Sequence, residues 1–195
     1  MFIEYGGKVP RVAASAFIAP TAVLIGDVEV GAEASIWFGV VLRADRGRIS
    51  VGARSAVEDN AVVHAREHHR TLIGDDVTIG HCAVLDDCTI ESGALVGSNA
   101  VILGGALVGR NSVVAAGSVV TIDARVPDGV VAAGAPAQVR KRLAGRSADW
   151  IEHSGAETLE QMHGYRVDGI GDPSSHELRS TARRRRGSSA IVNAP

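Results

Sequence analysis

Histidine and carboxylate side chains occupy matched positions in this sequence, and together they could hold a metal ion. Arg43, His64 and Asp86 each directly follow an aliphatic residue that opens a short repeat unit. Asp59 and His81 each lie two places after such an opening residue in other units. Imidazole nitrogens together with carboxylate oxygens form a donor set that suits zinc or iron(II). A single histidine on a protein surface, however, is more often solvated or bonded to a neighbour than a metal ligand.

The repeat that sets these positions has a period of six residues between Ile73 and Thr121, with one shorter step after Leu85. Aliphatic residues open eight consecutive units: Ile73, Ile79, Leu85, Ile90, Val96, Ile102, Val108 and Val114. This period matches neither a helix, with about 3.6 residues per turn, nor a plain strand, with a period of about two. It is typical of a solenoid in which short strands stack coil upon coil. We therefore predict an all-β solenoid, with three units closing each triangular turn of about eighteen residues.

Counting units around this prism predicts two ladders of polar side chains on successive coils. The first ladder contains Arg43, His64 and Asp86, and the second contains Asp59, His81 and Ser98. His64 and Asp86 can therefore meet one ion, whereas His81 lies near a different corner of the prism. It would join them only if a neighbouring subunit brought its own corner alongside, as a threefold cyclic assembly would do.

Two short segments interrupt the rhythm, at residues 46–50 and 65–71. The second is a polar loop that contains His68 and His69 and directly follows His64. Loops that interrupt a solenoid often carry function. The two imidazoles could shuttle protons at the mouth of a site, or they could simply be solvated.

The rhythm decays in a segment with two prolines, which predicts the end of the solenoid. We expect a solenoid domain over 1–137, a C-terminal α-helix packed along it over 138–164, and a disordered tail over 165–195. The tail carries four consecutive arginines at 183–186, which we expect to be solvated and not bound to nucleic acid.

Composition narrows the class of protein. Apolar residues make up 46% of the chain but aromatic residues only 4%, which fits a narrow core of Val, Ile, Leu and Ala. The net charge of −2 predicts no polyanionic or polycationic partner. The sequence shows neither a signal peptide nor the ~20 apolar residues of a membrane helix. We expect a cytoplasmic protein with a small-molecule substrate.

Cys82 and Cys88 match no zinc or redox spacing, so we expect both thiols to be packed and reduced.

Four segments in combination resemble the gamma-class carbonic anhydrase-like family of hexapeptide-repeat proteins. They are SIWFGVVLRAD at 35–45, EDNAVVH at 58–64, IGDDVTIGH at 73–81 and GAPA at 134–137. The resemblance implies a left-handed parallel β-helix, a homotrimer, and metal sites between subunits. It also implies that His64 binds the metal together with His81 of the adjacent subunit. Asp86 stands where the family has its third histidine ligand.

The resemblance assigns roles to four further residues. Arg43 is expected to pair with Asp59 across the subunit interface, and Asp45 is expected to be a further structural acid. Glu58 stands where the family has a glutamine that orients the metal-bound solvent. An ionised Glu58 could act as a general base.

The two replacements, Asp86 and Glu58, change the expected chemistry. A third imidazole would leave zinc its full charge, whereas a carboxylate ligand would make bound water less acidic. Two histidines and one carboxylate also match zinc hydrolases and non-haem iron(II) sites. We therefore predict a carbonic anhydrase-like, zinc-dependent or iron(II)-dependent lyase, acting on carbon dioxide or retuned to another small substrate.

Two other functions remain open from the sequence. A hexapeptide acyltransferase using acyl-coenzyme A would need a histidine base, which His64 or His81 could supply. A non-catalytic trimeric scaffold would hold no metal and would tolerate substitution of His64.

Overall fold

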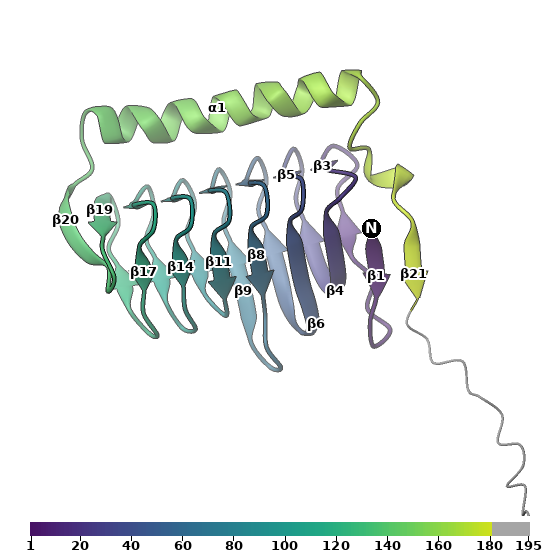
Figure 1. The fold of residues 1–195 in the computed structure, drawn as a ribbon, viewed down its shortest axis with the longest axis horizontal. Helices are drawn as coiled ribbons and strands as arrows, with labels where there is room; N and C mark the ends of the chain where they lie inside the picture. The colour runs from purple at the N-terminus through teal and green to yellow at the C-terminus, as the bar shows by residue number, and fades with distance from the viewer. Residues whose placement is uncertain (181–195) are drawn as a thin grey trace, which may run out of the picture.

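The computed structural model describes residues 1–180, without the side chains of residues 146, 147 and 150–154. Figure 1 shows a stack of short-stranded coils with one long helix, α1 (Arg146–Val167), running along it. Strands of successive coils pair in parallel, and the crossovers between them are corners of the prism. The predicted β-solenoid with a C-terminal helix is confirmed.

The coils have three faces, which we name by what lies on them. The helix face contains β3 (Phe17–Ile18), β5 (Ser35–Ile36), β7 (Ala56–Val57), β10 (Thr78–Ile79), β13 (Leu95–Val96), β16 (Val113–Val114), β19 (Val130–Ala133) and β20 (Gln138–Arg142). The valine face contains β8 (Val62–His64), β11 (Val84–Asp86), β14 (Val101–Ile102) and β17 (Val119–Val120). The arginine face contains β2 (Arg11–Val12), β9 (Arg70–Ile73), β12 (Thr89–Ile90), β15 (Leu107–Val108) and β18 (Arg125–Val126). Two long strands, β4 (Val23–Val30) and β6 (Val41–Val51), run through the corner between the valine and arginine faces.

The core is a column of aliphatic side chains from all three faces. Each of the eight residues that open the repeat units is at most 3% exposed, as the repeat predicted. Burial of these branched side chains supplies the main stabilising free energy, because each fully buried one contributes about 1.5–3 kcal/mol relative to exposure.

The three faces differ in what covers them. Helix α1 packs on the helix face, where it contacts β5 and β10, and the outward-pointing Ala56 and Leu95 are each only 3% exposed. The arginine face presents mainly charged and polar side chains, among them Arg48, Arg70 and Arg125. The valine face carries no element of the described chain over it, and its outward residues are apolar.

The C-terminal part differs from the sequence-based expectation. The segment Gln138–Arg142 is strand β20, antiparallel to β19, and not the start of a helix. Its exposed cationic side chains cap the open end of the stack, a position where charged residues discourage edge-to-edge pairing with another molecule. The helix starts at Arg146 and continues to Val167, past the expected end at 164.

Residues 168–180, expected to be part of a disordered tail, are ordered. They include a short 3₁₀ turn, η1 (Pro173–Ser175), and strand β21 (Leu178–Ser180). Strand β21 pairs in parallel with β1 (Phe2–Glu4), which in turn pairs with β4. The ring of His176 stacks on Phe2 with centroids 5.1 Å apart. The predicted tail is therefore wrong up to Ser180, and the arginines at 183–186 lie outside the described residues. The domain division itself stays a prediction.

The two cysteines lie in different environments. Cys88 is buried, as expected, and burial raises the pKa of its thiol to about 12. Cys82 is exposed at a corner of the prism, so the expectation of a packed thiol was wrong for this residue. Within the described part of the chain, no helix has the length and apolar character needed to cross a bilayer.

Close stacking of the coils predicts opposite effects for one substitution at two glycines. In Gly97→Ala the added Cβ would lie 2.5 Å from the backbone nitrogen of Ala116, so the coils must separate. In Gly155→Ala, within α1, the added Cβ meets nothing within 4 Å. We expect the first variant to lose about 1–3 kcal/mol and the second to gain up to about 1 kcal/mol.

Thermal unfolding of the parent and of both variants measures these changes in stability. Gly97→Ala should lower Tm by several degrees, and Gly155→Ala should raise it slightly. Equal Tm values for the parent and Gly97→Ala would show that the coils are not in close contact at this corner.

Candidate metal and catalytic site

The first predicted ladder forms at the edge of the valine face that adjoins the arginine face. Backbone pairing places His64 opposite Arg43 on one side and Asp86 on the other. The Nδ1 atom of His64 lies 2.9 Å from Oδ1 of Asp86. Arg66, in the loop that follows, places its Nε atom 3.7 Å from the other oxygen, Oδ2, of Asp86. The register predicted for this ladder is therefore confirmed, whereas the function of its members is not tested by it.

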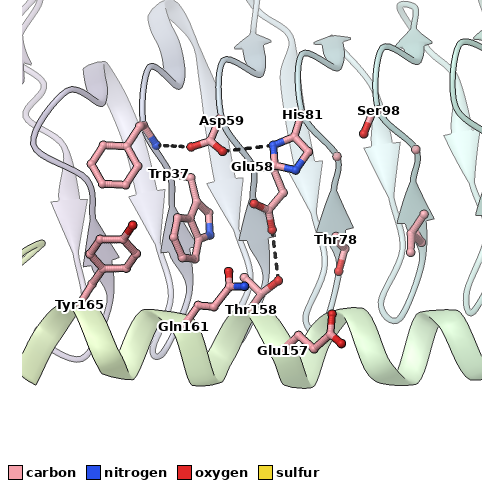
Figure 2. Close-up of a pocket in the computed structure, with 14 residues that line it drawn as sticks. Trp37, Glu58, Asp59, Thr78, His81, Ser98, Glu157, Thr158, Gln161 and Tyr165 are labelled. Carbon is pink, nitrogen blue, oxygen red and sulfur yellow. Dashed lines mark hydrogen bonds and ion pairs between the residues drawn. The ribbon is translucent and has the colours of Figure 1, made fainter.

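The second ladder forms at the opposite edge of the valine face, at the corner that joins it to the helix face. Asp59 Oδ2 lies 3.2 Å from Nδ1 of His81, and its Oδ1 accepts a hydrogen bond of 3.0 Å from the backbone of Phe38 (Figure 2). These contacts tie Asp59 to the coil before its own and to the coil after it. Glu58, beside it in sequence, offers an oxygen to the same place, and single donor atoms of Glu58, Asp59 and His81 lie within 4.8 Å of one another.

The two histidines share one arrangement. Each has its Nδ1 atom beside a carboxylate, His64 beside Asp86 and His81 beside Asp59. Among the described residues, no hydrogen bond reaches Nε2 of either ring. A carboxylate on Nδ1 favours the tautomer that leaves the Nε2 lone pair open, which is how metal-binding histidines are usually held.

The structure does not bring all predicted ligands together within one chain. His64 and Asp86 are the last residues of strands β8 and β11 of the valine face, whereas Asp59 and His81 precede these strands, so the face itself separates the two ladders. His64 and Asp86 stand outside the cluster that contains His81.

Six valines fill the valine face between the two ladders. The strand register places them one above another, in the order Val23, Val41, Val62, Val84, Val101 and Val119. Val62 and Val84, at the level of the ladders, are 39% and 38% exposed. A continuous apolar stripe of this kind on a surface is typical of an interface.

Glu58 projects into a cavity of about 720 Å³ between the helix face and α1. The hydroxyl of Thr158, on α1, donates a hydrogen bond of 3.2 Å to Oε1 of Glu58 (Figure 2). Burial raises the pKa of the Glu58 carboxyl above its ordinary value, although the nearby His81 and the Thr158 bond partly oppose this. A carboxyl with a raised pKa in a cavity is suited to proton transfer near neutral pH.

Residues of α1 complete this cavity and were not singled out from the sequence. Thr158, Glu157, Gln161 and Tyr165 line it from the helix side (Figure 2). Thr158 is 100 residues from Glu58 along the chain. No local pattern could have connected the two, because the contact depends on where α1 lies on the prism.

Four other predicted residues lie elsewhere. Arg43 forms an ion pair of 2.9 Å with Asp45 of its own chain, so its expected pairing with Asp59 across an interface stays a prediction. His68 and His69 line a separate cavity at the corner loops and do not line the cavity of Glu58.

The sequence matches known hexapeptide-repeat proteins. Residues 87–121 match the family model described as bacterial transferase hexapeptide (six repeats). A carbonic anhydrase of Geobacillus kaustophilus is 36% identical over 167 residues, which cover 86% of this chain and 92% of that protein. A probable carbonic anhydrase of Methanocaldococcus jannaschii is 48% identical over 126 residues, covering 65% and 79%.

A mitochondrial relative is longer than this chain. Gamma carbonic anhydrase 1 of Arabidopsis thaliana is 41% identical over 164 residues, covering 80% of this chain and 60% of that protein. The chain thus spans about three-fifths of the length of this relative.

Two solved structures have the same fold at similar identity. A hexapeptide transferase family protein from Anaplasma phagocytophilum superposes with a TM-score of 0.81 at 37% identity, covering 85% of this chain and 98% of that one. A putative acetyltransferase from Bacillus cereus superposes with a TM-score of 0.84 at 35% identity, covering 86% and 97%. Both solved structures are named as transferases, whereas the curated relatives at 36–48% identity are named as carbonic anhydrases. The chain belongs to the gamma-class carbonic anhydrase-like family of hexapeptide-repeat proteins.

Proposed function

We propose that this protein is a metal-dependent lyase that adds water to carbon dioxide or a similarly small substrate, at sites shared between the subunits of a homotrimer. The observation that carries the proposal is the pair of carboxylate-braced histidines at opposite edges of one uncovered apolar face. Neither histidine meets the other within one chain, so a complete site needs a second subunit.

The valine face supports the assembly. Burying its six valines against another subunit removes apolar surface from water, which favours association. A head-to-tail contact brings the His64 edge of one subunit to the His81 edge of the next. Such a heterologous contact is satisfied throughout when it closes into a ring, and a triangular prism suits a ring of three.

The residues present fit a divalent metal ion. His64 of one subunit and His81 of the next would hold it through the open Nε2 atoms of both rings. Asp86 would add a carboxylate oxygen by turning away from Nδ1 of His64, which it contacts in the single chain. Two imidazoles and one carboxylate suit zinc, and the same set suits iron(II). When bound, such an ion makes water a nucleophile near neutral pH.

Glu58 is proposed as the proton acceptor. As a water oxygen bonds to the carbon of carbon dioxide, the water loses a proton and bicarbonate forms. A carboxylate whose pKa is raised by burial is a stronger base than an exposed glutamate, and it faces the cavity beside His81. Thr158 holds it in one orientation.

Acyl transfer is the second candidate, because one of the two solved structures at 35–37% identity is named as a putative acetyltransferase. His64 or His81 would then act as a base toward an acceptor, with acyl-coenzyme A as donor. Removing metal separates the two reactions: carbon dioxide hydration should be lost on chelation, whereas acyl transfer needs no metal. A trimeric scaffold would show neither activity.

A shared site predicts that two inactive variants restore one another. His64→Ala and His81→Ala trimers should each lose metal, because each lacks one ligand in all three sites. After both are unfolded together and refolded in equal amounts, about a quarter of the sites should combine an intact His64 with an intact His81. Metal analysis of the separated trimers measures this.

The same experiment tests the alternative ligand set. If His64→Ala alone retains the parental metal content, the ion is held within one chain by Glu58, Asp59 and His81, and the shared-site proposal is wrong.

Replacing the unusual third ligand should increase activity. In Asp86→His, a neutral imidazole leaves the ion its full charge and lowers the pKa of the attacking water. We expect faster carbon dioxide hydration than in the parent at pH 7 to 8, with similar metal content, measured by stopped-flow. Asp86→Asn is the control, because it removes the carboxylate without adding an imidazole. A parent and an Asp86→His variant that both purify without metal would exclude the metal-dependent lyase and leave acyl transfer and the scaffold as the remaining functions.

Glu58→Gln should lower activity without lowering stability. Because burial raises the pKa of Glu58 above its ordinary value of 4.5, the folded protein holds this proton more tightly than the unfolded chain. The resulting stability is present below about pH 4.5 and is lost as pH rises through the folded-state pKa. The neutral variant has no such loss, so at pH 7 to 8 its Tm should equal or exceed that of the parent.

Loss of a general base should reduce kcat about 10²-fold or more. Hydration kinetics of the metal-loaded protein measure the loss of activity. Thermal unfolding in the presence of a chelator separately measures the change in stability. A variant with parental kcat would exclude Glu58 as the base.

A further inference from the structure

The two interruptions of the repeat meet at one corner of the prism. Gly47, in the first, lies so close to the second that an added Cβ would stand 2.5 Å from the backbone oxygen of Arg66 and 2.7 Å from Cβ of Ala65. The backbone nitrogen of Arg48 also donates a hydrogen bond of 3.2 Å to the oxygen of His69. The two loops therefore form one packed structure, although about twenty residues separate them in the sequence.

A cavity of about 660 Å³ lies against this structure and has a strongly basic lining. Six of its lining residues are basic: Lys8, Arg46, Arg48, His68, His69 and Arg70. The only acidic one is Asp87, whose side chain is 1% exposed and forms an ion pair with Arg66. None of these residues lines the cavity of Glu58, and neither His64 nor Asp86 lines this second cavity, although Asp87 directly follows Asp86 in the sequence.

The cations of this cavity are only partly neutralised. Three of them have carboxylate partners that do not line the cavity: Arg46 with Glu67 at 3.2 Å, Arg48 with Glu29 at 2.6 Å, and Lys8 with Asp27 at 3.1 Å. The guanidinium of Arg70 has no hydrogen bond or ion pair to any residue that the structure describes.

Arg70 also lies in an unfavourable place. The strand register sets it directly opposite Arg48, and both side chains point outward on the arginine face. Like charges opposite one another on adjacent strands repel. An anion between the two would turn this repulsion into attraction.

We propose that this cavity binds a small phosphate-bearing anion. Guanidinium groups donate paired, charge-assisted hydrogen bonds that match the oxygens of a phosphate. A doubly charged oxyanion suits Arg48 and Arg70 together, while the two loop imidazoles can donate further hydrogen bonds. This proposal goes beyond the proposed lyase activity and does not depend on it.

Titration calorimetry of the full chain tests this with inorganic phosphate and with phenyl phosphate as a simple ester. A chelator is present throughout, so metal binding does not affect the result. We expect a Kd below about 1 mM for at least one probe. Arg70→Ala should weaken binding about tenfold. Tighter binding of phenyl phosphate would identify the ligand as a phosphate ester, and tighter binding of phosphate would identify the inorganic ion.

Two further variants sharpen the test. Arg125→Ala removes an exposed arginine from the same face outside the cavity, and binding should change less than twofold. Glu67→Gln frees Arg46 from its carboxylate, and binding should become tighter.

The proposal is overturned if neither probe binds with a Kd below about 1 mM, or if Arg125→Ala weakens binding as much as Arg70→Ala does. The same holds if Glu67→Gln weakens binding. Phosphate should also raise Tm in the parent and not in Arg70→Ala, since a ligand stabilises only the fold that binds it.

Discussion

The hydrogen-bond register between coils is the constraint on which the rest of this structure depends. Each coil donates backbone N–H groups to the carbonyls of the next, as in the bonds from Glu58 to Ile79 at 2.9 Å and from Gly80 to Val96 at 2.7 Å. A slip of one residue would turn the aliphatic openers outward and the polar residues inward. Burial of the openers therefore fixes the register, and the register fixes which side chains stand above one another.

This constraint explains why much of the candidate site could be predicted. The position of His64 beside Asp86, and of His81 beside Asp59, follows from counting residues between openers. Counting gives the ladder but not the direction of a side chain. It therefore could not show that each carboxylate lies against Nδ1 of its histidine.

What the sequence could not predict depends on contacts between distant segments. The bond from Thr158 to Glu58 requires α1 to lie along the helix face, and nothing in either segment records that placement. The segment Gln138–Arg142 has no repeat pattern to mark it as a strand, and it becomes one because β19 offers it an open edge. Residues 178–180 are ordered for the same reason, through pairing with β1.

The faces and corners of the prism differ in surface character and in the residues that they carry. With α1 on the helix face and charges on the arginine face, the valine face is the one apolar surface that the described chain leaves uncovered. Chemistry-bearing side chains gather at the two corners that bound this face. The corner of Asp59 and His81 also borders the cavity under α1, so a residue such as Glu58 can be partly buried without entering the core.

Asp86 connects the candidate metal site to the basic corner. Its carboxylate lies between the ring of His64 and the guanidinium of Arg66, and Arg66 also holds Asp87 beneath the basic cavity. A carboxylate that shares its charge with a guanidinium donates less of that charge to a metal ion. Arg66 therefore offsets part of the negative charge by which Asp86 departs from a histidine. The charge at position 86 that would act on a metal ion beside His64 thus depends on the loop that carries Arg66.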